Sequence, residues 1–333
     1  MSLRVLFHEL GGPEVLRLEE HRLGAPGHGE LALDVEAIGL NRAEAAFRRG
    51  AYLDRPALPS GLGYEAAGTV AAVGPGVSGF AVGQPVSVVP AFSMNDYGTY
   101  GDRVLVPAAA VVPRPASVDP VTAAAAWMAY LTPFGALVEL GGMRAGDTVV
   151  VTAAASGVGV ATVQLAALLG AEPIAVVRSD AGADRLREAG AVRVTTATGE
   201  ELTREILEHT DGAGARFVFD AVAGPGVRDL ARATALGGTL FVHGTLSGQP
   251  TPFPGTDEMR DFTMRSYTLF EITRSPERLR RAARFVGSAL AAGRLRPLVD
   301  RTFELTEIVQ AHAYLETTAR VGKIVVTVER RQE

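Results

Sequence analysis

The sequence predicts an α/β protein, in which a doubly wound parallel sheet with helices on both sides is joined to a second domain rich in short strands. From Asp147 to Ser179 the pattern reads strand, tight turn, helix and strand, and further strands and helices alternate after it. Before Pro115, short strands are separated by glycine and proline, which is typical of a small β-barrel. The length of 333 residues allows two domains.

The segment from Asp147 to Ser179 has the order of elements that binds a dinucleotide. Thr148 to Val151 is a β-branched run, Ala153 to Gly159 consists mostly of small residues, and Val160 to Leu169 has helical spacing of apolar residues. Pro173 to Val177 predicts the next strand. Such a turn presents backbone N–H groups at a helix N-terminus, where a pyrophosphate is favoured.

The turn departs from the strict G-x-G-x-x-G fingerprint. Ala154, Ser156 and Gly159 stand at the three glycine positions, and an extra glycine lies in the turn. The motif is weak alone, and its strand-turn-helix context strengthens it. We expect the pyrophosphate at Ser156, Gly157, Val158 and Gly159.

The residue that ends the second strand predicts which cofactor binds. An acidic side chain there would bind the ribose 2′-OH of NAD, but this chain has Arg178 with Ser179 beside it. A guanidinium and a hydroxyl suit a 2′-phosphate, so we expect NADPH. The alternative is that Arg178 is a solvated arginine at a strand end.

Composition excludes several classes of protein. The formal net charge is −5 and no basic face is apparent, so we expect no nucleic-acid partner. Two uncharged windows, Pro120 to Val138 and Thr148 to Ala171, fit buried elements better than membrane spans. The chain has no cysteine, which removes disulfides and cysteine zinc sites, and no signal peptide is apparent. We expect a cytoplasmic protein.

In the first 122 residues, a short helix is expected at Ala43 to Arg48 and a glycine-rich bend at Leu58 to Gly68. The strands expected there are Leu3 to Phe7, Leu16 to Glu20, Leu31 to Ile38, Thr69 to Val73 and Pro85 to Val89.

From residue 123 on, helices and strands alternate. An alanine-rich helix is expected at Val121 to Leu140, kinked or broken at Pro133. Strands are expected at Thr148 to Val151, Ile174 to Val177, Val192 to Thr195, Phe217 to Phe219, Thr239 to Val242 and Gly322 to Val328. Helices are expected at Glu200 to His209, Gly226 to Leu236 and Ser275 to Ala292, the last with Arg278, Arg280, Arg281 and Arg284 outward.

Six segments in a fixed order carry a resemblance to a known family. They are 48–77, Tyr130-Leu-Thr-Pro-Phe-Gly-Ala-Leu, Ala154-Ala-Ser-Gly-Val-Gly, Phe219-Asp-Ala-Val-Ala-Gly, Gly237-Gly-Thr-Leu and Val321-Gly-Lys-Ile-Val-Val. Over nearly its whole length the chain resembles a zinc-independent medium-chain dehydrogenase/reductase of the zeta-crystallin-like quinone oxidoreductase branch. The resemblance implies a GroES-like β-barrel domain at 1–122, completed by 268–333, and a Rossmann NADP-binding domain at 123–267. The active site would lie in the cleft between them.

The same resemblance implies the type of chemistry. Zinc-dependent relatives have a Gly-His-Glu segment with a zinc-binding histidine, and here this segment is Gly63-Tyr64-Glu65. The six histidines show no ligand spacing, so we expect no metal. Without a Lewis acid, the acceptor must already be electrophilic, so we expect hydride transfer from NADPH to a quinone or an α,β-unsaturated carbonyl.

Site residues follow from the resemblance. Asn41 and Thr132 would line the nicotinamide end of the site, and Tyr52 and Tyr64 would donate hydroxyl hydrogen bonds to the substrate oxygen. Each tyrosine could instead be an amphipathic wall residue. Glu65 is expected to be a buried structural carboxylate paired with an arginine, with a catalytic role as the alternative.

Further cofactor contacts are implied at the end of the fifth strand and near the C-terminus. His243, Gly244 and Thr245 match the family segment beside the nicotinamide ribose, although His243 is unusual there and could simply pack at the strand end. Lys323, the only lysine, matches a glycine-lysine pair near the site, and the alternative is a surface charge at a strand start.

Two departures and two alternatives remain open. Gly182 and Ala197 replace a lysine and a tyrosine of many NADPH-using relatives, so Arg178 and Arg185 would have to hold the 2′-phosphate. The fold could also serve a stand-alone enoyl-thioester reductase of polyketide type, or an NADPH-binding protein without turnover. The family implies a homodimer formed through the edge strand of the nucleotide domain.

Overall fold

The computed structural model describes residues 2–258, 261–317 and 320–329. The chain divides into two compact units. The first unit is Met1–Met128, Thr273–Ala319 and Lys323–Glu333, and the second is Ala129–Ile272 and Arg320–Gly322. The domain limits predicted at 122/123 and 267/268 stay predictions. Each unit is described below by itself.

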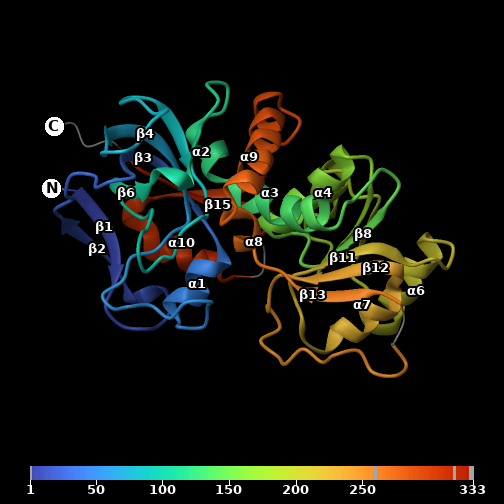
Figure 1. Ribbon diagram of the computed structural model, residues 1–333. Helices are drawn as coiled ribbons and strands as arrows, with labels where there is room; N and C mark the ends of the chain where they lie inside the picture. The colour runs from blue at the N-terminus through green and yellow to red at the C-terminus, as the bar shows by residue number, and fades with distance from the viewer. Residues whose placement is uncertain (1, 259–260, 318–319, 330–333) are drawn as a thin grey trace. The chain divides into compact units, whose positions relative to one another are not determined.

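The first unit contains a two-stranded sheet and a seven-stranded sheet of order β14-β15-β3-β4-β5-β7, with β6 also paired to β3 (Figure 1). The strands are β1 (Ser2–Phe7), β2 (Leu16–His21), β3 (Glu30–Leu40), β4 (Glu65–Val73), β5 (Pro85–Val88), β6 (Arg103–Pro107), β7 (Val111–Pro113), β14 (Val299–Glu304) and β15 (Lys323–Thr327). β15 runs antiparallel to β3, with Val326 opposite Ile38. The last described strand therefore pairs with β3, the first strand of this sheet in the sequence.

Two helices of the first unit begin at side-chain caps. Asp119 accepts a hydrogen bond from the Thr122 N–H and is followed by proline, and Ser275 caps the longest helix in the same way. The helices are α1 (Arg42–Arg48), α2 (Pro120–Ala124), α9 (Pro276–Ala291) and α10 (Ile308–Leu315), with 3-10 turns at Pro13–Val15, Ala108–Ala110 and Leu305–Glu307. α3 (Trp127–Pro133) begins at the end of this unit.

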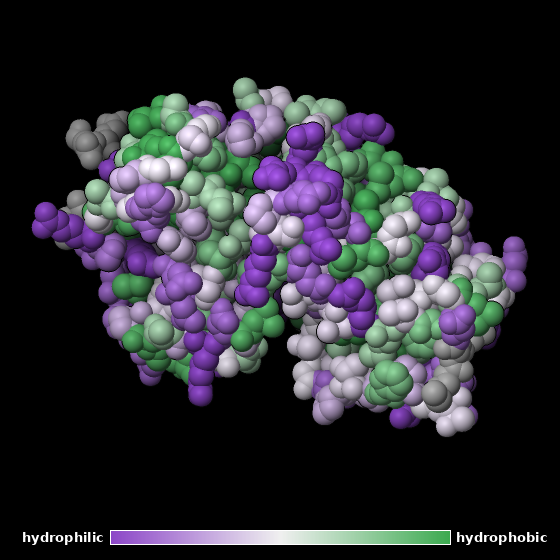
Figure 2. Space-filling model, in the orientation of Figure 1, coloured by the Kyte–Doolittle hydropathy of each residue, from purple (hydrophilic) through white to green (hydrophobic). Residues whose placement is uncertain are grey.

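α9 has the solvated face that its sequence predicts. Arg280, Arg281 and Arg284 are exposed, and Arg281 pairs with Glu277 one turn earlier. Figure 2 shows hydrophilic side chains gathered over this helix. In the described ranges, no helix combines the length and the apolar character that a membrane crossing requires.

A buried polar network fixes α1 against α10. The fully buried Arg48 donates to the Gly11 carbonyl at 3.1 Å, to His312 Nδ1 at 2.8 Å and to Glu316 at 2.5 Å. Because arginine is only a donor, Nδ1 of His312 must accept, which leaves Nε2–H to donate to Tyr100 Oη at 3.1 Å. Burial lowers the pKa of His312 to about 3, so the ring is neutral.

The second unit is a six-stranded sheet of order β10-β9-β8-β11-β12-β13, in which every pair is parallel. The strands are β8 (Thr148–Val151), β9 (Glu172–Val176), β10 (Arg193–Thr195), β11 (Ala215–Asp220), β12 (Thr234–Val242) and β13 (Thr263–Ser266). In chain order this is 3-2-1-4-5-6, the doubly wound order. The chain adds strands on one side of β8 first and then on the other, so the strand order switches sides between β8 and β11. In such sheets, ligands bind at this switch point, outside the carboxyl ends of the strands.

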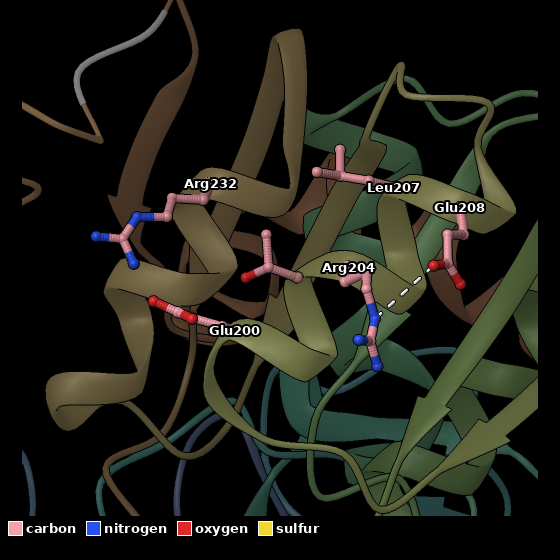
Figure 3. A pocket seen from close by; sticks show the side chains of 6 residues that line it. Glu200, Arg204, Leu207, Glu208 and Arg232 are labelled. Atoms are coloured by element: carbon pink, nitrogen blue, oxygen red, sulfur yellow. Dashed lines mark ion pairs between the residues drawn. The ribbon is translucent and has the colours of Figure 1, made fainter.

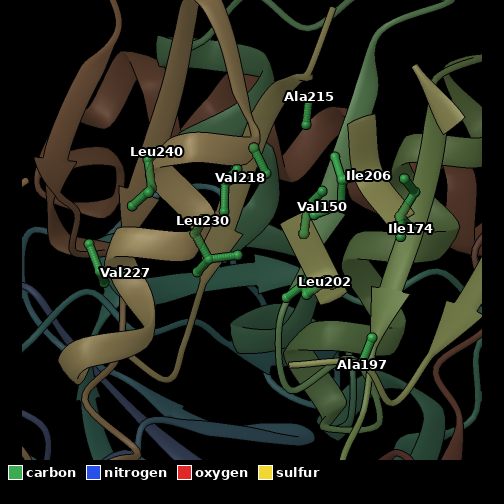
Figure 4. Packing of buried hydrophobic residues seen from close by; sticks show 11 residues of the cluster. Val150, Ile174, Ala197, Leu202, Ile206, Ala215, Val218, Val227, Leu230 and Leu240 are labelled. Atoms are coloured by element: carbon green, nitrogen blue, oxygen red, sulfur yellow. The ribbon is translucent and has the colours of Figure 1, made fainter. Parts of the chain in front are cut away.

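Apolar side chains pack one face of this sheet against two helices. Val150, Val218 and Leu240 come from three neighbouring strands, and they meet Ile206 and Leu230 of the covering helices (Figure 4). The helices of the unit are α4 (Gly157–Leu168), α5 (Ala183–Glu188), α6 (Gly199–His209), α7 (Val227–Ala233) and α8 (Phe270–Thr273), with a 3-10 turn at Gly224–Gly226. Burial on both faces explains why the strands read as continuous apolar runs.

Two predicted helices differ from the structure. The run Val121 to Leu140 is not one helix, because α2 ends at Ala124 and α3 begins only at Trp127, whereas the break predicted at Pro133 is present: the chain continues there as a π-helix at Phe134–Leu140. The helix predicted at Gly226 to Leu236 ends at Ala233, because Thr234 already pairs with Ala215 in the sheet. Sheet pairing overrides the local helical pattern there.

Candidate active site

The dinucleotide turn lies at the carboxyl end of β8 in the second unit. Ser156 caps α4, and its hydroxyl accepts from the Gly159 N–H at 3.0 Å. Among the described residues, the N–H groups of Gly157 and Val158 have no hydrogen-bond partner, as expected of the first turn of a helix. A Cβ at Gly159 would lie 2.6 Å from Ala154 Cα, so only glycine allows this packing.

Asp220 and Thr152 connect the ends of β11 and β8 beside this turn by hydrogen bonds. The sequence analysis missed this pair. The fully buried Asp220 ends β11 and accepts from the Thr152 hydroxyl at 2.6 Å, from the Val222 N–H at 3.0 Å and from the Ala223 N–H at 2.8 Å. The Thr152 hydroxyl accepts in turn from the Ala221 N–H at 2.9 Å. Thr152 directly follows β8 and Asp220 ends the adjacent β11, and this placement of polar residues at two strand ends is a signal that could have found the pair.

His243 follows β12 at the same edge of the sheet. Its backbone N–H donates to the Asp220 carbonyl at 2.8 Å, and its half-buried ring stacks on Phe219 with ring centroids 3.9 Å apart. Burial lowers the pKa of His243 to about 3, so the imidazole is neutral at physiological pH. Gly244 packs on Ala221, and Thr245 is exposed.

The end of β9 carries the cation expected to select the cofactor. Arg178 and Ser179 are both exposed, and the Arg178 guanidinium has no hydrogen-bond or ion-pair partner in the described part of the chain. Gly182 has a φ of +87°, and a Cβ there would lie 2.3 Å from Val321 Cγ2, which explains why no lysine stands at 182. Thr132 is buried on α3.

In the first unit, Asn41 and Lys323 meet in a buried cluster with two carboxylates. Lys323 Nζ lies 2.5 Å from Glu65 Oε1 and 2.6 Å from Asn41 Oδ1, and Glu65 Oε2 accepts from the Met128 N–H at 2.8 Å. Glu65 is buried as predicted, but the prediction that its partner is an arginine is wrong. Lys323 is 5% exposed and therefore not a surface charge.

Glu44 is a second carboxylate in this cluster, and the sequence analysis missed it. It is fully buried, and it accepts from the Asn41 backbone N–H at 2.5 Å and from Asn41 Nδ2 at 3.2 Å. Burial raises the pKa of Glu44 to about 8, while the charge of Lys323 acts in the opposite direction. At neutral pH this carboxyl is therefore mostly protonated.

Tyr52 and Tyr64 lie together in the first unit, with ring centroids 6.2 Å apart. Tyr64 is 1% exposed, and its hydroxyl is hydrogen-bonded to that of the half-buried Tyr52. Burial raises the pKa of Tyr52 to about 12 and that of Tyr64 further. Both are neutral phenols, and one of the two hydroxyl protons is used in the hydrogen bond between them.

A surface pocket of about 410 Å³ lies elsewhere, on the outer side of α6 and α7 (Figure 3). It contains an ion pair of 3.7 Å between Arg204 and Glu208. Its lining residues are Glu200, Thr203, Arg204, Leu207, Glu208 and Arg232, and none of them is a predicted site residue. Within the described ranges, no group of three or more His, Asp or Glu side chains is arranged to hold a metal ion.

Comparison with known proteins agrees with this architecture. Residues 27–116 match the alcohol dehydrogenase GroES-like domain, and residues 157–288 match the domain described as zinc-binding dehydrogenase. A quinone oxidoreductase of Pseudomonas aeruginosa is 32% identical over 330 residues, which cover 98% of this chain and 99% of that protein. The chain belongs to the quinone oxidoreductase branch of the medium-chain dehydrogenase/reductase family. It is therefore an oxidoreductase with a GroES-like and a Rossmann domain.

Other members of this family extend the comparison. A 2-haloacrylate reductase of Burkholderia sp. is 27% identical, with 98% of each chain covered. The crystal structure of the Escherichia coli quinone oxidoreductase complexed with NADPH has a TM-score of 0.90 and 28% identity, covering 98% of this chain and 99% of that one.

The raised pKa of Glu44 leads to a stability prediction. Between pH 4.5 and about 8 this carboxyl is protonated in the folded protein and ionised in the unfolded chain. Its contribution to stability is therefore complete below pH 4.5 and is lost as pH rises toward 8, at about 1.4 kcal/mol per pH unit. Glu44→Gln, which keeps an acceptor but cannot ionise, should remove this loss in urea unfolding measured at pH 5, 6.5 and 8.

The exposed Glu201 offers a matched control, because Glu201→Gln also removes one carboxylate. That variant should keep the dependence of the wild-type protein on pH. The same pH dependence in the Glu44 variant and the wild type would contradict the assignment.

Proposed function

We propose that this chain is an NADPH-dependent reductase that transfers a hydride to quinones or to α,β-unsaturated carbonyls. The observation that carries the proposal is the combination of unpartnered N–H groups at the α4 turn with a free cation at the end of β9. The Pseudomonas and Burkholderia relatives are named for a quinone and for a haloacrylate, and both kinds of acceptor are electrophilic without a metal.

The residues of the second unit fit NADPH. The N–H groups of Gly157 and Val158 and the dipole of α4 would hold the pyrophosphate, and the close packing at Gly159 would bring the backbone near it. Arg178 and Ser179 would hold the 2′-phosphate. The Escherichia coli relative, whose structure contains NADPH, supports this assignment.

The neutral His243 would face the same end of the sheet. A neutral imidazole can accept one hydrogen bond and donate another, so it suits a ribose hydroxyl. Gly244 and Thr245 would complete this contact with their backbone and hydroxyl groups, and Thr132 would add a hydroxyl at the nicotinamide. These roles are proposals that follow from the family pattern.

NADPH supplies the hydride when it is bound, and the chain's own task is to orient the acceptor and to stabilise charge on its oxygen. Tyr52, the more exposed of the two tyrosines, would donate a hydrogen bond to that oxygen, and Tyr64 would strengthen this donor by donating to the Tyr52 hydroxyl oxygen. One hydride and one proton reduce the acceptor by two electrons. The proton comes finally from water, because a phenol with a pKa near 12 is a hydrogen-bond donor more than an acid.

We also propose that two copies of the chain form a homodimer through β13. This strand is an edge of the sheet, paired with β12 on one side only. Exposed apolar side chains that follow β12, Leu246 and Phe253, would be covered in the dimer.

The function is tested by oxidation of NADPH against a panel of 1,4-quinones, enones, alkenals and an enoyl thioester, with a metal chelator present. We expect turnover on quinones or enones that the chelator does not change. Preference for the enoyl thioester would favour a polyketide-type reductase, and binding of NADPH without turnover on any acceptor would contradict the proposal.

Two variants, measured in the same assay, test which tyrosine donates to the substrate oxygen and which one supports that donor. Tyr52→Phe removes the outward donor and should lower kcat by roughly 10- to 100-fold, whereas Tyr64→Phe leaves that donor in place and should cost less. A larger loss of kcat in Tyr64→Phe than in Tyr52→Phe would contradict the role of Tyr52 as the direct donor.

The side chain at position 178 is proposed to determine the preference of the protein for NADPH over NADH. Arg178→Glu should raise the KM for NADPH by roughly 10- to 100-fold, because a charge-assisted hydrogen bond is replaced by repulsion, with a smaller effect on NADH. Arg187→Gln, on the exposed face of α5 where Arg187 pairs with Asp184, is the control and should leave both KM values unchanged. Equal effects of Arg178→Glu on both cofactors would remove the 2′-phosphate assignment.

The dimer is tested by sedimentation. The wild-type protein should have twice the mass of one chain, and Met264→Pro should give the mass of one chain, because proline at an edge strand interferes with further pairing. A wild-type mass of one chain at micromolar concentration would exclude the dimer.

A further inference from the structure

Lys323 has every N–H group of its ammonium engaged inside the first unit. Nζ lies 2.5 Å from Glu65 Oε1, 2.6 Å from Asn41 Oδ1 and 2.9 Å from the Leu40 carbonyl oxygen. A lysine has three such donors, so none is left for another ligand. A direct hydrogen bond to a cofactor, as the family pattern suggests, would require one of these contacts to break.

These contacts give the Asn41 amide a single orientation. The atom that faces Lys323 must be the oxygen, because an ammonium only donates. The amide nitrogen therefore faces Glu65 Oε1 at 3.0 Å and Glu44 Oε1 at 3.2 Å. The Asn41 side chain also accepts from the Glu44 backbone N–H in the capping box at the start of α1, so the amide is held in one direction.

The residue before Lys323 is held by the dinucleotide turn. The Gly322 N–H donates to the Ala155 carbonyl at 2.9 Å, and Gly322 forms an isolated parallel bridge with Ser156. Gly322 has a φ of +111°, a conformation that only glycine adopts readily. Lys323 is therefore joined by a single peptide bond to a residue that the turn holds.

We propose that Lys323 is a positioning residue, which holds the Asn41 amide in its reactive orientation and, through Gly322, couples that orientation to occupation of the dinucleotide turn. The proposal rests on the proposed function, because it takes Asn41 as a residue of the nicotinamide site. Glu65 acts with Lys323 by fixing the ammonium and the amide nitrogen together.

The first test separates positioning from stability. Lys323→Met keeps the length of the side chain but leaves the buried Glu65 charge without its partner, so both kcat and Tm should fall.

The double variant Lys323→Met with Glu65→Gln removes both charges. Its Tm should recover toward wild type, while kcat stays roughly 10- to 100-fold low, because nothing orients Asn41. The KM for NADPH should change less than about threefold in either variant, because Lys323 does not contact the cofactor. Recovery of kcat together with Tm would overturn the proposal.

The second test asks whether Lys323 acts through Asn41. In an Asn41→Ala background, Lys323→Met should have little further effect on kcat, because the group that it positions is gone. If the two substitutions instead lower kcat by independent factors that multiply in the double variant, Lys323 does not act through Asn41.

Hydrogen exchange gives a readout that does not need turnover. NADPH should slow exchange in the segment 40–48 of the wild-type protein, and this effect should disappear in the double variant although NADPH still binds. Failure of NADPH to bind the wild-type protein would refute the proposed function, whereas binding without protection of 40–48 would refute only the coupling.

Discussion

A buried ion pair between Glu65 and Lys323 determines how the first unit is assembled. Glu65 begins β4 and Lys323 begins β15, the two strands on either side of β3. Removing two charges from water costs several kcal/mol for each ion, and this cost is offset only when every remaining donor and acceptor is satisfied. Here the three N–H groups of Lys323 and both oxygens of Glu65 have partners. The start of α1 at Asn41 and the backbone at Met128 therefore depend on the same pair.

The second unit depends instead on how little space remains at the ends of its strands. Gly159 and Gly244 each leave only 2.6 Å between a hypothetical Cβ and backbone atoms of a neighbouring segment. Asp220 and Thr152 tie the ends of β11 and β8 with four hydrogen bonds that involve the backbone or each other. The result is a rigid turn with unpartnered N–H groups, and rigidity of this kind is what anion binding requires, because the donors need no rearrangement.

Local patterns were enough to predict most strands and the turn before α4, because they depend on neighbours within a few residues. Glu65 could be predicted to be buried, but not its partner. Of the 32 arginine and lysine residues, 31 are arginine, and Lys323 lies 258 positions away in sequence. The contact between Tyr64 and Tyr52, and the burial of Glu44, arise in the same way from tertiary packing that no periodicity encodes. The early end of α7 shows the reverse case, in which sheet pairing of Thr234 stops a helix that the local pattern predicts to continue to Leu236, whereas the break at Pro133 was predicted from the proline itself.

The charges of the buried cluster explain why two carboxylates can share one lysine. With Glu44 and Glu65 both ionised, Lys323 would leave one uncompensated negative charge in a region without water. The raised pKa of Glu44 avoids this, since its proton makes the cluster neutral up to about pH 8. A neutral cluster exerts little net field on a nearby acceptor, so stabilisation of developing negative charge must come from directed hydrogen bonds. Among the candidate residues of the first unit, we propose the half-buried Tyr52 hydroxyl, which is hydrogen-bonded to Tyr64, as the donor for that purpose.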